Sequence, residues 1–286
     1  MPSRFAEEGA RRLGEEKLPD AVRAFSAGLE ADPNDPDCLL GLAQARLRQG
    51  ERGDAEDALH RLLAVVPGHG EAESHLAWLA STLGDEGAVA RLEEIAARPG
   101  AGFAELMNLG AALFDRGDFA GAEAAFGRAL ALAPKSRAAL FEVGRLRLHR
   151  GDAEGAWPLL AEAAKSGDPL AQGLLVRAHR ARRQPVEARE AALAAQRSTP
   201  QLNAFAEALY EIALETRDLG EAVRQAEALR AMDPRSPRCA YLHGVALREA
   251  GDPDGADRAW QEALRLSDES GPPELRAQVM ALLGRR

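Results

Sequence analysis

The feature of this sequence that most constrains its fold is a repeat with a period of about 34 residues. One alanine keeps this spacing along the chain, at Ala21, Ala55, Ala88, Ala122, Ala156, Ala188, Ala222 and Ala256. Large residues keep the same phase four positions later, at Phe25, Leu59, Leu92, Phe126, Leu160 and Trp260. A fixed period of this length indicates tandem copies of one supersecondary unit, each of which buries its apolar face only against its neighbours.

Residues 103–136 indicate what the repeated unit is. They contain two segments whose apolar residues are spaced for one face of a helix, with Arg116-Gly117-Asp118 between the segments and Pro134 after the second. Gly110 and Ala122 are small enough for two helices to approach closely. The pattern therefore predicts a helical hairpin.

This hairpin resembles the tetratricopeptide repeat in seven packing residues, Leu106, Leu109, Gly110, Leu113, Ala122, Phe126 and Pro134. The resemblance implies an all-α fold, a right-handed superhelical α-solenoid of tandem helix-turn-helix repeats. It predicts a single array over residues 2–270, with repeats at about 2–35, 36–69, 70–102, 103–136, 137–168, 169–202, 203–236 and 237–270. A proline-initiated segment, 272–283, is expected to form a C-terminal capping helix.

Repeat 3 is the least regular hairpin of the first half. It carries Glu73 where repeat 4 has Leu106, and Gly/Pro-rich junctions flank it at residues 66–70 and 98–102. These junctions indicate either a hinge or merely unusual helix ends. In repeat 5, Pro158 is expected near the start of the second helix, where the first four N–H groups have no intrahelical partner.

Repeat 7 exchanges a small residue for a large one and a large residue for a small one. It carries Tyr210 where repeat 4 has Gly110, and Ala226 where repeat 4 has Phe126. Repeat 6 makes the same two exchanges, with Val176 and Ala192. Because cores tolerate rearrangement when their volume is kept, Tyr210 is expected to be buried in the space left beside Ala226.

The charge and the cysteine content exclude several classes of partner and compartment. A net charge of −9 and a pI near 5.3 argue against nucleic acid as a partner. No apolar run approaches the roughly 20 residues of a membrane span, so no membrane partner is expected. Cys38 and Cys239 lie in repeats 2 and 8, too far apart in a solenoid for a disulfide. These observations predict a cytoplasmic protein, or a periplasmic one if a leader was trimmed.

The sequence offers no catalytic or metal-ligating constellation. Its six histidines are not paired with one another at metal-ligand spacing. The Gly-Asp pairs in the stretches at 151–156 and 251–256 resemble calcium loops, but the repeat phase makes them hairpin turns with Asp as a helix N-cap. The chain is therefore predicted to be non-enzymatic, with no cofactor and no metal.

The resemblance also implies where a partner would bind, because the first helices of tetratricopeptide repeats line a concave groove. The groove positions, carried over by phase, are His75, Trp78, Met107, Asn108, Phe114, Phe141, Arg145, Leu148, His149, Arg177, Arg180 and Glu211. They run from aromatic to cationic to acidic residues, which predicts a protein or peptide partner with a hydrophobic segment followed by acidic residues. Of the family's chaperone-tail clamp, only Asn108 matches.

Several alternatives stay open at this point. The aromatic residues could tuck between neighbouring helices, and Arg177 and Arg180 could simply pair with the glutamates of repeat 7. The leading functional prediction is a scaffold or adaptor that binds a partner peptide or helix in the groove. The rival predictions are a self-assembly module that forms a homodimer, and a regulatory or targeting domain of a larger enzyme.

Overall fold

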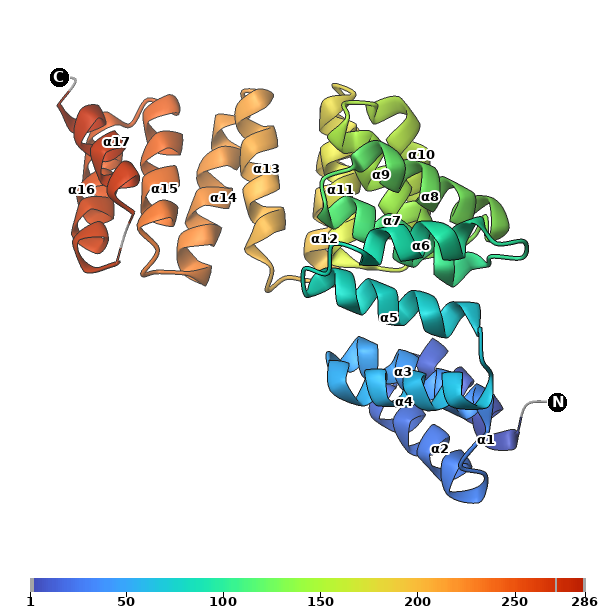
Figure 1. Cartoon of the computed structure of the whole chain (residues 1–286). Helices are drawn as coiled ribbons and strands as arrows, with labels where there is room; N and C mark the ends of the chain where they lie inside the picture. Colours follow the sequence, from blue (N-terminus) through green and yellow to red (C-terminus); the bar gives the residue numbers. More distant parts are fainter. Residues whose placement is uncertain (1–2, 271, 285–286) are drawn as a thin grey trace. The chain divides into compact units, whose positions relative to one another are not determined.

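The computed structural model describes residues 3–270 and 272–284, and within these ranges every regular element is an α-helix. This confirms the predicted all-α class of tandem helical hairpins. The helices are α1 (Arg4–Gly14), α2 (Leu18–Ala31), α3 (Pro36–Gln49), α4 (Arg52–Val65), α5 (Gly70–Thr82), α6 (Ala88–Ala97), α7 (Phe103–Asp115), α8 (Phe119–Leu132), α9 (Arg137–His149), α10 (Ala153–Ala164), α11 (Pro169–Ala181), α12 (Pro185–Ser198), α13 (Asn203–Glu215), α14 (Leu219–Met232), α15 (Pro237–Glu249), α16 (Pro253–Ser270) and α17 (Pro273–Leu283) (Figure 1).

The hairpin of α7 and α8 shows how the sequence specifies each unit. Gly117, with φ of +83°, provides the left-handed backbone of the turn, and the Asp118 carboxylate caps α8 by accepting from the Gly121 N–H at 2.9 Å. A Cβ atom on residue 110 would lie only 2.5 Å from Cε1 of Phe126. Gly110 is therefore required for the ring of Phe126 to lie against α7.

The Gly-Asp sequences that resemble calcium loops are turns, as predicted. Asp152 accepts from the N–H of Gly155 at 2.9 Å, and Asp252 accepts from the N–H of Gly255 at 2.8 Å. Each aspartate satisfies one of the unpaired N–H groups at the start of a second helix.

The chain forms two compact units, Met1–Ala139 and Leu140–Arg286. In the first unit, α1 pairs with α2, α3 with α4, α5 with α6 and α7 with α8, and each hairpin packs on the next. Its largest fully buried side chains include Phe25, Leu39, Leu59, Leu62, Leu79, Leu92, Leu106 and Phe126. The division of the whole chain into eight repeats of one array stays our proposal.

In the second unit, α10 packs on α11, and α11–α12, α13–α14 and α15–α16 form hairpins. Trp260 is the largest fully buried side chain, and its ring lies against Gly244 of α15. The last helix, α17, packs on α16 and buries Val279 against the cluster around Trp260. A C-terminal helix thus covers apolar surface of the final hairpin.

The predicted burial of Tyr210 is confirmed. Its side chain is only 3% exposed and lies in one cluster with Ala222, Ala226 and Ala246. The hydroxyl group donates a hydrogen bond of 3.1 Å to the carbonyl oxygen of Leu242. The large residue on α13 thus occupies space that a large residue on α14 would otherwise fill.

The expectation for Pro158 is wrong. Pro158 lies inside α10, which begins at Ala153, and so it is beyond the first four N–H groups of that helix. Proline at this position removes the hydrogen bond that an N–H would donate to the carbonyl of Glu154. Pro158 therefore destabilises α10 by the loss of one backbone hydrogen bond.

No helix in the described part of the chain has both the length and the apolar character needed to cross a membrane.

Candidate functional site

Five polar side chains from the first helices of three consecutive hairpins are linked to one another in the first unit. We call Gln44 of α3, Glu71, Ser74 and His75 of α5, and Asn108 of α7 the first-helix network. The Gln44 Nε2 donates to Glu71 Oε1 at 2.7 Å, and the same oxygen lies 3.6 Å from His75 Nε2. The Asn108 Nδ2 donates to Ser74 Oγ at 3.0 Å and lies 3.1 Å from His75 Nδ1.

These contacts define the hydrogen-bonding state of His75. The amide of Asn108 can donate one proton to Ser74 and the other to His75 Nδ1, which makes Nδ1 an acceptor. The neutral imidazole then carries its proton on Nε2, which faces Glu71. At 3.6 Å this last contact is longer than a hydrogen bond, so the attraction to Glu71 is mainly electrostatic.

Glu71 is the charged group of the network. Its interaction with His75 lowers its pKa below the ordinary value of 4.5, and the hydrogen bond from Gln44 acts in the same direction, although burial opposes both. Ser74 is buried, and the side chain of His75 is only 13% exposed. The network is therefore partly buried, and its contacts orient the side chains before any partner binds.

The repeat phase predicted His75 and Asn108 as site residues, but it did not predict Gln44, Glu71 and Ser74. His75 and Asn108 occupy equivalent positions of repeats 3 and 4, so two polar residues at one phase of adjacent first helices were the signal available. Gln44, Glu71 and Ser74 could not be recognised in this way, because their hydrogen-bond partners do not occupy the equivalent position in the neighbouring repeat.

Apolar side chains flank this network on the same helices. Trp78 is half-buried and packs against the core of the first hairpins. The half-buried ring of Phe114 contacts the ring of Phe119, with centroids 5.3 Å apart. Met107 is also half-buried. Each of these side chains thus combines a packing contact with an exposed remainder.

In the second unit, one of the predicted cationic groove residues is already held by carboxylates. Arg180 of α11 forms an ion pair of 2.5 Å with Glu211 and a second ion pair with Glu215, both on α13. The hydrogen bonds that Arg180 donates to Glu215 and to Glu211 raise its pKa, although burial opposes them. Arg180 thus pairs with glutamates of repeat 7, as the alternative interpretation of the sequence predicted.

The remaining predicted residues of the second unit differ from one another in exposure. Arg145 is half-buried and donates from Nε to Glu142 at 2.9 Å. Arg177 is exposed. Leu148 packs against a core cluster that contains Leu160 and Ala178. Phe141 is half-buried and His149 is exposed.

The polar groups of the described residues do not converge as a metal site. Within residues 3–270 and 272–284, no three His, Cys, Asp or Glu side chains come together with the geometry of metal ligands. Both cysteines are buried and free. The first-helix network joins two of the predicted groove residues, His75 and Asn108, and its chemistry is that of hydrogen bonding.

Comparisons with known proteins agree with this architecture. Two family models described as tetratricopeptide repeat match residues 12–84, and residues 107–169 and 208–274. A curated relative, cellulose synthase 2 operon protein C of Komagataeibacter xylinus, is 29% identical over 98% of this chain. The chain spans 20% of the length of that relative.

Solved structures show the same fold at low sequence identity. The human IFIT1 dimer with PPP-AAAA is 16% identical with a TM-score of 0.60, over 93% of this chain and 73% of that chain. YrrB, described as a TPR protein with an unusual peptide-binding site, is 16% identical with a TM-score of 0.54, over 66% of this chain and 97% of that chain.

Proposed function

Because this chain belongs to the tetratricopeptide repeat family, we propose that it is a non-enzymatic scaffold or adaptor that holds a partner peptide or helix against the first helices of its hairpins. The family fold supports a protein-interaction scaffold in general, since stacked hairpins present long continuous surfaces. The fold alone does not select a partner, so the specific proposal rests on the residues of the site.

The first-helix network is the observation that carries the proposal. Asn108 uses its Nδ2 for Ser74 and His75, while its Oδ1 makes no hydrogen bond to any described residue. An amide held in this way offers a pre-oriented acceptor for a backbone N–H of a partner. The half-buried Trp78, Met107 and Phe114 on the same helices provide apolar area beside it. Hydrogen bonds to the partner backbone would then give register, and the apolar contacts would give affinity.

The predicted preference for acidic residues in the partner now rests on Arg177. Arg180 and Arg145 are paired with carboxylates of the chain itself, and a ligand would have to compete with these. Arg177 is exposed and can donate two parallel hydrogen bonds to a carboxylate. The proposed partner keeps the form of a hydrophobic segment followed by acidic residues, and the proposed location stays cytoplasmic.

The proposal is tested by affinity capture with the immobilised chain, followed by peptide mapping of the bound proteins. Asn108→Ala removes the amide from the first-helix network and should release the specific partner. Leu132→Ala is a matched control, because Leu132 is an exposed apolar residue at the end of α8, outside the network. The proposal fails if wild-type, Asn108→Ala and Leu132→Ala proteins retain the same set of partners in the same amounts.

The role of the arginines is tested separately with the captured partner. Arg177→Ala should weaken binding about 3- to 10-fold at low salt and less at high salt, because exposed charges are screened. Arg180→Ala should change binding much less, because Arg180 is held by Glu211 and Glu215. Equal losses for both variants would contradict this assignment.

A further inference from the structure

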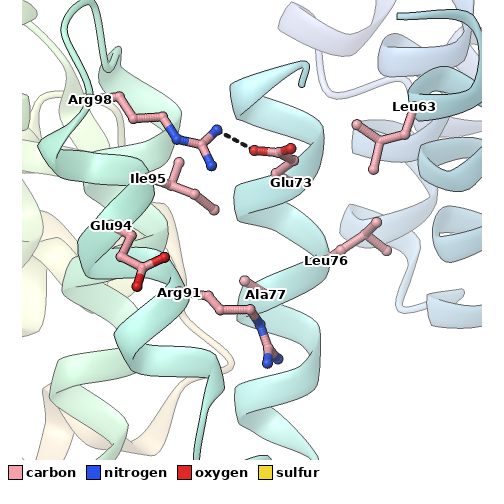
Figure 2. A pocket seen from close by; sticks show the side chains of 8 residues that line it. All are labelled: Leu63, Glu73, Leu76, Ala77, Arg91, Glu94, Ile95 and Arg98. Carbon is pink, nitrogen blue, oxygen red and sulfur yellow. Dashed lines mark hydrogen bonds and ion pairs between the residues drawn. The ribbon is translucent and has the colours of Figure 1, made fainter. Parts of the chain in front are cut away.

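The first unit contains a pocket that does not belong to the first-helix network. It has a volume of about 340 Å³ and is lined by Leu63 of α4, by Glu73, Leu76 and Ala77 of α5, by Arg91, Glu94 and Ile95 of α6, and by Arg98, which directly follows α6. Figure 2 shows α5 between the residues contributed by α4 and those contributed by α6. On α5, Glu73, Leu76 and Ala77 share one face by their i, i+3, i+4 spacing, whereas His75 and Trp78 lie on the other. The pocket and the first-helix network are therefore two different surfaces.

The pocket lies where repeat 3 lacks a leucine that repeats 2, 4 and 5 have. At the position of Glu73, repeats 2, 4 and 5 carry Leu39, Leu106 and Leu140, and all three leucines are buried. A carboxylate cannot take that place in a core without a large desolvation cost. Glu73 instead remains partly exposed and forms an ion pair with Arg98, the residue after α6, across the pocket (Figure 2).

The lining is apolar inside and charged at the rim. Ala77 and Ile95 are buried, and Leu63 and Leu76 are half-buried. Both arginines of the rim are neutralised, since Arg98 pairs with Glu73 and the exposed Arg91 pairs with Asp85 at 2.5 Å.

The uncompensated charge at the rim is negative. Glu94 is exposed, and it makes no ion pair or hydrogen bond with any described residue. An anionic ligand such as a phosphate is disfavoured here, because both arginines are paired and Glu94 is not. A cation next to the pocket would instead meet an unpaired carboxylate.

We propose that this pocket binds a large apolar side chain of a partner protein, such as tryptophan, that has a lysine or arginine beside it. The volume is at the low end of the roughly 300–1,000 Å³ of ligand sites, which suits one large side chain rather than a larger ligand. Aromatic anchors that enter a desolvated pocket dominate many protein interfaces. The partner side chain takes the place of the leucine that repeat 3 lacks, and the basic group of the partner faces Glu94.

The first test uses three matched tripeptides with the full chain. The peptides are acetyl-Ala-Trp-Lys-amide, acetyl-Ala-Trp-Glu-amide and acetyl-Ala-Ala-Lys-amide, and the readout is the backbone amide shifts of Ala77 and Ile95 by NMR. The Trp-Lys peptide should shift both amides saturably. The Trp-Glu peptide should bind at least about 3-fold more weakly because of Glu94, and the Ala-Lys peptide should give no saturable shift.

Two substitutions of one residue separate a binding site from a packing defect. Glu73→Leu introduces the leucine that repeats 2, 4 and 5 have here, so it should fill the pocket, raise the melting temperature and weaken Trp-Lys peptide binding by about 10-fold or more. Glu73→Gln removes the ion pair to Arg98 but has the size of glutamate, so it should keep binding within about 3-fold. Should Glu73→Leu fail to fold, Glu73→Met places a more flexible apolar side chain in the same pocket and carries the same expectation.

The outcomes are distinct from those of the proposed function. Asn108→Ala, which tests the first-helix network, should leave tripeptide binding unchanged. Glu94→Gln should remove the preference for the Trp-Lys over the Trp-Glu peptide. The proposal is overturned if the Trp-Lys peptide shifts neither amide, if the Ala-Lys peptide shifts them equally, or if a filled pocket binds the Trp-Lys peptide as tightly as the wild type.

Discussion

At the scale of single residues, Tyr210 shows how one exchange is compensated by another. Because its ring fills the space beside Ala226, Tyr210→Ala should open a cavity and lower the free energy of unfolding by roughly 3–5 kcal/mol. Tyr210→Phe keeps the ring and removes only the hydrogen bond to Leu242, so it should cost about 1 kcal/mol. Denaturant titrations measure both values. An alanine variant within about 1 kcal/mol of the wild type would mean that the ring is not part of the core.

Glu71 gives the first-helix network a dependence on pH whose sign can be stated. Its pKa in the folded chain is lower than the ordinary value of 4.5, so the carboxylate stabilises the fold above that pH. This stabilisation is lost as the pH falls through the lowered pKa of the folded state. Glu71→Gln should therefore lower the free energy of unfolding by about 1–2 kcal/mol at pH 7, and the difference should shrink as the pH is lowered from 4.5 toward 3. Urea titrations between these pH values test it, and a constant difference would contradict it.

At the scale of helices, replacing proline by alanine should have opposite effects on stability at two positions. Pro158 lies inside α10, so Pro158→Ala restores an N–H donor to the carbonyl of Glu154 and should stabilise the chain by roughly 1–3 kcal/mol. Pro185 is the first residue of α12, where no intrahelical partner is lost and the fixed φ angle favours the helix. Pro185→Ala should therefore be neutral or destabilise by up to about 1 kcal/mol. Thermal unfolding of both variants decides the matter, and a gain for Pro185→Ala alone would refute the argument.

At the scale of the whole molecule, a chain of stacked hairpins should respond to damage locally. Each hairpin contacts mainly its neighbours, so the stability of the array is close to a sum of hairpin and interface contributions. Tyr210→Ala should thus lower hydrogen-exchange protection most in α13–α16 and leave α1–α4 within about 2-fold of the wild type. Exchange measured by mass spectrometry on peptides from each helix tests this. Equal loss of protection from α1 to α16 would show that the chain unfolds as a single cooperative body.

The sequence by itself determined the repeated hairpin, because period and phase report on packing that recurs between neighbours. The sizes of packing residues such as Gly110, Ala122 and Phe126 can be compared with those at the equivalent positions of neighbouring repeats. The burial of Tyr210 was predicted from such a comparison. The period did not determine the candidate sites. The position of Glu73 was recognised as irregular, but whether the chain closes that gap or leaves a pocket depends on how α4, α5 and α6 pack together.

Only the tertiary structure could decide the pairing of the polar side chains. Arg180 of α11 pairs with Glu211 and Glu215 of α13, and Asn108 bonds to Ser74 and His75. These contacts depend on rotamers and helix spacing rather than on the period. The lost hydrogen bond at Pro158 likewise depends on where α10 begins, which the repeat phase gave only to within a turn. Periodicity thus fixes which faces are buried, while the partner of each polar group is a matter of three-dimensional geometry.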